Sequence, residues 1–322
     1  MSPLVVAICF FAIALMRVIQ NVCSKSSSMD IKSGDTFFRY SAYYYLIAGL
    51  FSLITLSIVG FHGLDTHTIL TSLVSAVLFG IGLYAGIEAI KGCTLIVSTM
   101  FGLGGLVISC GVSYFWFGEG ISVFQIVGLF LFMLGVYLLT PSTKSDVKRI
   151  SLRTYVLLFV KLLSEGLVMV AQKYFALFSP LGAGANSAMY SFLTFIFNCL
   201  IMLGCVLFMC LRKKKNPAPA PVSDSKPVVF GLSKVLLICG LALAFAVFVI
   251  NLLVTEMSKS VDSILLFPIS SAISIFITTL IGWIVFKEKL TPRNFVGLII
   301  GLISIIVIGM LTPDTVATLF GA

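Results

Sequence analysis

The feature that most constrains this chain is a succession of ten apolar segments, each about the length of a membrane-spanning helix. A bilayer core requires ~20 consecutive apolar residues per helix. The ten segments are approximately 3–23, 37–60, 69–90, 94–116, 122–140, 152–175, 185–211, 231–255, 261–286 and 294–311. Hydrophobic residues make up 59% of the chain and charged residues 10%, which excludes a soluble domain. Because no β-barrel-type alternation occurs, the sequence predicts an all-α membrane protein with ten transmembrane helices.

The two halves of the chain repeat each other. The first half contains, in order, Glu88-Ala-Ile-Lys91, Phe117-Gly-Glu119, Gly128 and Thr140-Pro141. The second half contains Glu256-Met-Ser-Lys259, Phe286-Lys-Glu288, Gly297 and Thr312-Pro313. Each half holds five predicted helices, and this odd number makes the second half enter the membrane from the opposite side. We therefore predict a five-plus-five inverted repeat, with residues 1–141 and 142–322 as its units and a basic, proline-rich loop at about 212–230.

This repeated pattern resembles the EamA-like branch of the drug/metabolite transporter superfamily. The resemblance covers essentially all ten helices and is best from Phe117 to Pro141 and from Pro268 to Pro313. In the first half, the glycine-rich segment 101–105 replaces the family's mid-helix proline, so glycine must supply the flexibility there. The resemblance implies an alternating-access secondary transporter of a small organic metabolite or drug. It also implies a substrate cavity between helices 1–4 and 6–9, with helices 5 and 10 outside it.

Two small-xxx-small patterns predict close helix packing. They are Gly82-Leu-Tyr-Ala-Gly86 in the third apolar segment and Gly297-Leu-Ile-Ile-Gly301 in the tenth. Such spacing lets two helix backbones approach closely. For the second pattern, packing within one chain is favoured over the alternative, a homodimer through helices 5 and 10.

The net charge of +9 is interpreted as an orientation signal. On the ten-helix arrangement, 17 of the 21 Lys and Arg residues lie on one side. The positive-inside rule then predicts cytoplasmic basic loops and external termini, whereas the resembled family usually keeps both termini in the cytoplasm. We favour the charge count. The expected location is the plasma or inner membrane as a multi-pass protein, with membrane lipid and a small-molecule substrate as partners and no nucleic acid.

The strongest candidate site residues lie in the sixth predicted helix. Glu165 is the one glutamate without a counterpart in the repeat, and Lys161 precedes it by one turn. Gln172 lies on the same helix face. An ionisable residue within a span is costly and faces a cavity or a partner. We therefore predict that this face lines the substrate cavity; a self-neutralised structural ion pair is the alternative.

The first predicted helix supplies the companion residues. Arg17, Gln20 and Asn21 form one polar stripe on an apolar helix. Arg17 can bind a carboxylate or phosphate or pair with Glu165; snorkelling to the interface is the alternative. Tyr84 and Asn251 are weaker candidates for substrate binding, since each can simply bond a neighbouring helix.

Other charged residues are interpreted as scaffold. Glu88, Glu119, Glu256 and Glu288 sit at helix ends, where capping or solvation accounts for them. Lys25 and Lys173 lie further out and are expected to snorkel to the interface.

Competing functions find less support in the sequence. His62 and His67 share one short segment, and no catalytic pairing at membrane depth can be built, so we expect no enzyme. The chain has no ATP-binding G-x-x-x-x-G-K-[ST] signature, and no metal or cofactor is expected. A flippase for lipid-linked substrates remains an alternative to the transporter, and a membrane-embedded enzyme or a channel is a less favoured one.

Overall fold

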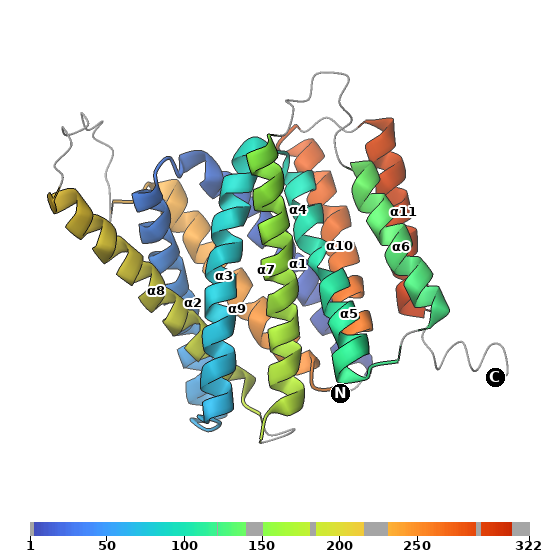
Figure 1. Cartoon of the computed structure of the whole chain (residues 1–322), viewed down its shortest axis with the longest axis horizontal. Helices are drawn as coiled ribbons and strands as arrows, with labels where there is room; N and C mark the ends of the chain where they lie inside the picture. Colours follow the sequence, from blue (N-terminus) through green and yellow to red (C-terminus); the bar gives the residue numbers. More distant parts are fainter. Residues whose placement is uncertain are drawn as a thin grey trace.

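The computed structural model describes residues 3–120, 122–139, 151–180, 185–215, 231–287 and 291–310. This part of the chain is all-α (Figure 1). Its helices are α1 (Pro3–Asp30), α2 (Gly34–Val59), α3 (Thr66–Gly92), α4 (Leu95–Leu103), α5 (Gly105–Phe117), α6 (Val123–Leu139), α7 (Leu152–Phe178), α8 (Ser187–Lys215), α9 (Lys234–Met257), α10 (Ser263–Ile284) and α11 (Pro292–Met310).

Seven helical stretches of the described chain are long and apolar enough to cross a membrane. They are Val5–Asp30, Gly34–Val59, Thr66–Gly92, Leu95–Phe117, Leu152–Phe178, Ser187–Arg212 and Lys234–Met257. Three shorter apolar helical stretches are Val123–Gly135, Ser274–Ile284 and Pro292–Ser304. The chain is therefore a multi-pass helical membrane protein, and each of the ten predicted segments coincides with helix.

Local sequence explains where several of these helices begin. Ser33, Asp65, Thr94, Ser151 and Ser233 each precede a helix, and each side chain accepts a hydrogen bond from the backbone N–H three residues later. Such caps satisfy backbone donors that the first helical turn leaves unpaired. The polar residues between apolar segments therefore define the ends of the spans.

The fourth predicted helix forms α4 and α5, which meet at Gly104 in the glycine-rich segment. The two form one helical span, because the Gly104 backbone stays in the right-handed helical region and its N–H donates to the carbonyl oxygen of Met100. After Gly104, α5 crosses α7 with the two backbones almost in contact. A Cβ at Gly105 would lie 2.6 Å from the backbone N of Gly166, and a Cβ at Gly166 would lie 2.7 Å from the carbonyl oxygen of Gly105. Only glycine allows this crossing. Helix α10 also runs without a break, through Pro268.

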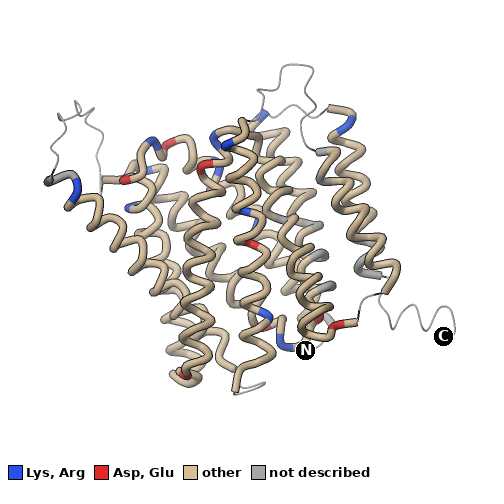
Figure 2. The backbone as a smooth tube through the Cα atoms, in the orientation of Figure 1, with Lys and Arg blue, Asp and Glu red and all other residues tan. Residues whose placement is uncertain are grey.

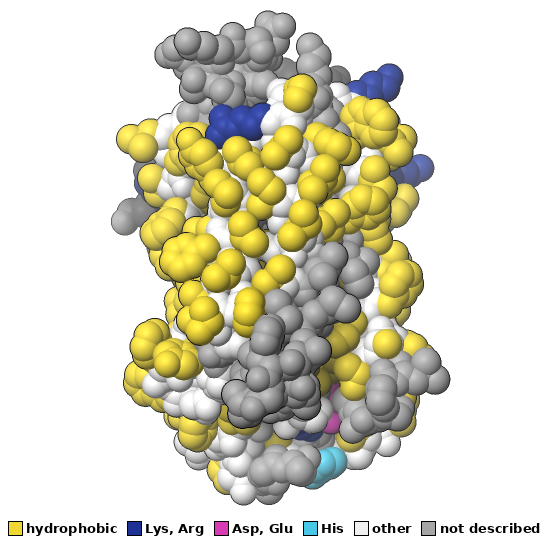
Figure 3. Space-filling model, turned by 90° about the vertical axis from the view of Figure 1, so that its right-hand side faces the viewer, with side chains coloured by type: hydrophobic (Ala, Val, Ile, Leu, Met, Phe, Trp, Pro, Cys, Tyr) yellow, Lys and Arg dark blue, Asp and Glu magenta, His cyan; other side chains and the backbone are white. Residues whose placement is uncertain are grey.

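Helices α6 and α11 pack on each other at the side of the bundle (Figure 1). A Cβ at Gly135 of α6 would lie 3.0 Å from the carbonyl oxygen of Gly297 and 3.0 Å from the N of Gly301. The small-xxx-small pattern of α11 thus serves packing within the chain, as favoured from the sequence. The face seen in Figure 3 is largely hydrophobic, as expected for a surface in contact with lipid.

Lys and Arg residues gather at one end of the bundle (Figure 2). We call this the basic end; α3 finishes and α7 begins there. The two helices are joined there by an ion pair, with Arg153 Nη2 3.7 Å from Glu88 Oε2. We call the opposite end, where α7 finishes and α10 begins, the far end. The chain begins at the far end (Figure 1).

The predicted basic loop, at about 212–230, overlaps the end of α8. The apolar span ends at Arg212, as predicted, and the helix continues to Lys215. Arg and Lys are good helix formers, whereas Pro217 cannot continue a helix, so the basic run extends the helix. Residues 216–230 of that loop lie outside the described residues, as do Glu288 and the two Thr-Pro motifs (140–141 and 312–313).

Candidate functional site

A cavity of about 100 Å³ lies inside the bundle. Its walls come from α1, α2, α3 and α4 of the first half and from α7 and α9 of the second half. Six of the eight predicted site residues line it: Arg17, Gln20, Asn21, Lys161, Glu165 and Gln172. That these residues bind a substrate stays a prediction, but residues far apart in sequence do share one cavity.

Lys161 and Glu165 form the predicted ion pair, one turn apart on α7. The Lys161 Nζ lies 3.7 Å from Glu165 Oε1, and the lysine side chain is only 8% exposed, against 30% for the glutamate. Lys161 Nζ also donates to the carbonyl oxygen of Ser98 at 2.9 Å and to its Oγ at 3.1 Å. The lysine is thus held by α4, while the carboxylate stays partly open to the cavity.

The structure places Arg17 inside the cavity rather than at the membrane interface. Its Nε is buried and has no hydrogen-bond partner among the described residues, and Glu165 attracts the guanidinium electrostatically. On the same helix, Asn21 Nδ2 donates to Thr278 Oγ1 of α10 at 3.4 Å. The polar stripe of α1 therefore faces the second half of the chain.

Gln172 links the cavity wall to a buried amide behind it. Its Nε2 donates to Asn251 Oδ1 at 2.5 Å, and Asn251 Nδ2 donates to Ser191 Oγ at 3.0 Å. Asn251 is fully buried and positions Gln172 rather than lining the cavity. Tyr84 does not line the cavity either: it is 42% exposed, and its ring packs edge-on against Phe37.

Glycines make room for the charged groups. A Cβ at Gly102 of α4 would lie 2.7 Å from Glu165 Oε2 and 2.9 Å from Lys161 Cε. On α3, a Cβ at Gly82 would lie 3.2 Å from Ser164 Cβ, and one at Gly86 would lie 3.5 Å from Lys161 Cδ. The Gly82–Gly86 pattern packs α3 tightly against α7, as predicted, and this packing forms one wall of the cavity.

Sequence reasoning missed two polar residues of α4. Ser98 binds Lys161, and Thr99 lines the cavity with a buried Oγ1 that has no partner among the described residues. Both lie in an apolar helix without a charged residue. The glycine-rich segment immediately after them was the available signal, since it brings α4 close to α7.

A buried ion pair ties helices together at the far end. Lys173 Nζ lies 2.6 Å from Glu119 Oε1, and the two side chains are 3% and 8% exposed. Lys173 Nζ also donates to the carbonyl oxygen of Val261, and Glu119 Oε2 accepts from the backbone N–H of Ser263 at the start of α10. The prediction that Lys173 snorkels is wrong, because a buried carboxylate is within its reach. Glu119 serves as scaffold and cap, as predicted.

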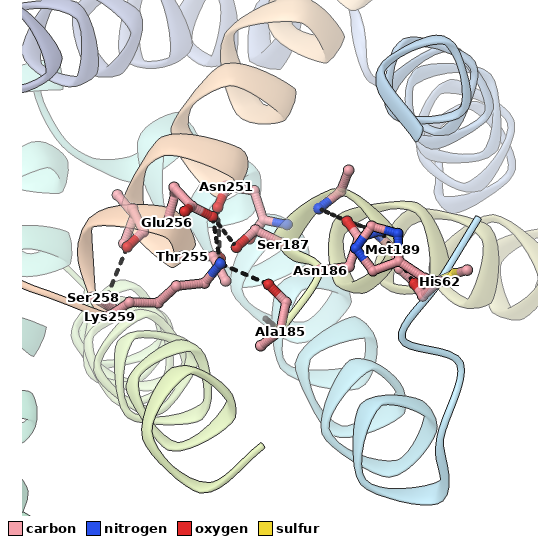
Figure 4. A network of polar contacts seen from close by, with 12 residues as sticks. His62, Ala185, Asn186, Ser187, Met189, Asn251, Thr255, Glu256, Ser258 and Lys259 are labelled. Atoms are coloured by element: carbon pink, nitrogen blue, oxygen red, sulfur yellow. Dashed lines mark hydrogen bonds and ion pairs between the residues drawn. The ribbon is translucent and has the colours of Figure 1, made fainter. Parts of the chain in front are cut away.

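A second polar network joins α8 and α9 (Figure 4). Glu256 Oε2 accepts from Ser187 Oγ and from Lys259 Nζ, both at 2.7 Å. Lys259 Nζ also donates to the carbonyl oxygen of Ala185 at 2.6 Å, and the neighbouring Asn186 binds the carbonyl oxygen of His62. Glu256 therefore has the scaffold role predicted for it. Its repeat counterpart Glu88 pairs with Lys91 in the same i, i+3 spacing.

Comparison with known proteins supports the fold and nothing finer. No protein-family model and no curated protein matches the chain. Among solved structures, 28 chains match. One of them, a protein known from its crystal structure, aligns over 97% of this chain and 99% of its own with a TM-score of 0.67 and 12% sequence identity. At that identity the likeness concerns the fold alone.

Proposed function

We propose that this protein is a secondary transporter that carries a small organic molecule across the membrane by alternating access. The observation that carries the proposal is a polar cavity whose walls come from both halves of a multi-pass membrane protein. Intramembrane ionisable residues are costly, and here three of them, Arg17, Lys161 and Glu165, face one cavity. A substrate-binding role explains why that cost is retained.

The helix packing supports a five-plus-five inverted repeat. If α1–α6 and α7–α11 are the two halves, with α4 and α5 as one span, α1 corresponds to α7 and α3 to α9. The packing of α1 on α9 then has a counterpart in that of α3 on α7. Likewise, the contact between α3 and α8 has a counterpart in the contact between α9 and α2. The contacts α2–α8 and α6–α11 each join two corresponding helices, so exchanging the halves leaves them unchanged. This exchange is expected when a pseudo-two-fold axis relates the halves.

The position of the cavity supports alternating access. On α1 and α3, the lining residues begin near mid-helix, at Arg17 and Leu78, and continue toward the basic end, whereas on α7 and α9 they pass mid-helix toward the far end, to Gln172 and Ile250. At the far end, the buried Glu119–Lys173 ion pair joins α5, α7 and the start of α10. We infer a conformation in which the cavity is reached from the basic end, and transport requires the opposite conformation as well.

The same architecture supports placing the chain near the EamA-like transporters that its sequence pattern resembles. Helices α6 and α11 contribute no described residue to the cavity wall, as the resemblance implies for helices 5 and 10, but α8 and α10, which the resemblance places at the cavity, contribute none either. The homodimer through these helices stays a prediction.

Glu165→Gln tests the proposed site. We expect substrate flux in proteoliposomes to fall at least tenfold or to lose its coupling, because the carboxylate is partly open to the cavity beside two cations. Thermal stability in detergent should stay near that of the unmodified protein, since Lys161 keeps both hydrogen bonds to Ser98. Glu88→Gln, outside the cavity, serves as the matched control. A Glu165→Gln protein that transports normally would contradict the site, and one that unfolds would support a structural ion pair instead.

A further inference from the structure

The charged side chains of the cavity do not cancel. Its wall contains two cations, Arg17 and Lys161, and one carboxylate, Glu165. With all three ionised, the described lining carries a net charge of +1. Because charge is poorly solvated at membrane depth, an excess cation there favours a compensating anion.

The two cations differ in what already binds them. Lys161 is held by both oxygens of Ser98 and lies within 3.7 Å of Glu165. Arg17 makes no hydrogen bond to any residue that the structure describes, although its Nε is buried. A guanidinium presents donors in a planar fork that matches two oxygens of a carboxylate. Among the described lining residues, Arg17 is therefore the cation without a hydrogen-bond partner, and its terminal nitrogens, rather than the buried Nε, are the donors that a ligand can reach.

A further polar atom in the cavity wall lacks a partner. Thr99 is only 4% exposed. Its Oγ1 is buried and has no hydrogen-bond partner among the described residues. A buried hydroxyl without a partner is costly, but a water-sized group in the cavity does not reach this atom, so a ligand can pair with it only after a local movement of α4. This observation is independent of Arg17, because it comes from α4 rather than α1.

The remaining wall combines polar side chains, such as Gln20, Ser24 and Gln172, with apolar ones. Phe79 and Leu83 of α3, Val168 and Met169 of α7, and Val247 of α9 are among the lining residues. One water needs ~10–15 Å³ of such space, so a cavity of about 100 Å³ holds roughly seven to ten waters. This is the size of a small organic molecule with an apolar body.

We propose that the transported substrate is a singly charged organic anion, a small carboxylate with an apolar body, whose charged group binds Arg17. This inference rests on the proposed transport function and names the substrate class of the same cavity. A single negative charge neutralises the net charge of +1 on the lining. A doubly charged phosphoryl group would leave a net negative charge, and a cation would increase the positive charge.

Matched ligands test the inference on the full-length protein in detergent. The panel contains cyclohexylmethyl, benzyl and straight-chain skeletons, each as the carboxylate, the neutral amide, the amine and the phosphonate, at a pH between the second phosphonate pKa and the amine pKa. Binding is measured as a concentration-dependent rise in unfolding temperature. We expect at least one carboxylate to bind at least tenfold more tightly than its own amide and its own phosphonate, with no binding of the amines. Amides, amines or phosphonates that bind as tightly as the carboxylates, or a panel in which no carboxylate binds, would overturn the inference.

Arg17→Gln identifies the residue responsible. Loss of a charge-assisted hydrogen bond should weaken carboxylate binding roughly 10- to 100-fold and remove the preference over the amide. Arg153 lies outside the cavity and its side chain is 76% exposed. Arg153→Gln should therefore change neither the affinity for the carboxylate nor the preference over the amide. An Arg17→Gln protein that keeps the full preference would refute the assignment to Arg17. The comparison of acid with amide needs no variant, so a variant that fails to fold does not block the test.

Flux measurements separate this inference from the proposed function. Transport of an amine or an amide would support the proposed transport function and contradict the proposal that the substrate is an anion. The protein could instead bind carboxylates through Arg17 and produce no flux in proteoliposomes. That result would support the anion-binding site and contradict the proposed transport function.

Discussion

At the residue scale, glycine decides how closely the helices around the site approach. Gly105 and Gly166 let α5 and α7 cross with their backbones almost in contact, and Gly102 leaves space for the Lys161–Glu165 pair. Any side chain at these positions would displace backbone or charged atoms. These glycines therefore position the cavity without contacting a substrate.

A pair of substitutions on one helix tests this role. Gly105→Ala should lower the free energy of unfolding by about 1–3 kcal/mol or more, because its Cβ would meet the backbone of α7 at 2.6 Å. Gly111→Ala on the same helix meets nothing within 4 Å and should be neutral or stabilising by about 0.5–1 kcal/mol. Unfolding in detergent measures both changes. Equal stability of the two variants would refute the close crossing.

Local spacing predicted part of the site and could not predict the rest. Lys161, Glu165 and Gln172 share one helix face, so their common exposure to the cavity follows from helical periodicity. Ser98 and Thr99 joined the site through contacts between helices, which no local pattern in a single sequence encodes. The wrong prediction for Lys173 has the same cause, because its partner Glu119 lies on another helix.

At the scale of helices, the far end is held by an ion pair that also caps a helix. Glu119 follows α5, pairs with Lys173 of α7 and accepts from the first backbone N–H of α10. Breaking a buried ion pair by removing one partner leaves the other charge uncompensated. The same contacts must rearrange if the cavity opens at this end.

Lys173→Met tests the strength of this link. The substitution should lower the free energy of unfolding by about 3–5 kcal/mol, because the Glu119 carboxylate is left buried without its cation. Lys91→Met removes a lysine from a more exposed pair, with side chains 32% and 21% exposed, and should cost about 1 kcal/mol or less. Adding Glu119→Gln to Lys173→Met should recover part of the loss. Equal effects of the two lysine substitutions would contradict a buried ion pair.

Hydropathy predicted the helices better than their ends. Each apolar segment forms helix because a backbone in lipid must satisfy its own hydrogen bonds. Two details escaped prediction. The fourth segment changes at a single residue, Gly104, where α4 meets α5, and α8 continues to Lys215, three residues past the end of its apolar span at Arg212. Both details depend on the backbone conformation at one or two positions. Hydropathy is averaged over a whole segment and does not detect such local differences.

At the scale of the whole molecule, two halves enclose one polar cavity. The lining comes from α1–α4 on one side and from α7 and α9 on the other, and the helix contacts exchange when the halves are exchanged. The central claim is that these halves move relative to each other, so that the cavity faces one side of the membrane and then the other.

Two-sided labelling of a cavity cysteine tests that claim most directly. Ser24 lines the cavity and is half-buried, so Ser24→Cys is introduced after the eight native cysteines are replaced. A membrane-impermeant thiol reagent is then applied from each side of oriented vesicles. A second protein also carries Phe117→Cys and Phe178→Cys, at far-end positions whose rings lie 5.9 Å apart, joined by a short bifunctional thiol reagent. We predict labelling from both sides in the free protein and from the basic end alone in the joined protein. Labelling of the free protein from one side only, or labelling from both sides after joining, would contradict alternating access.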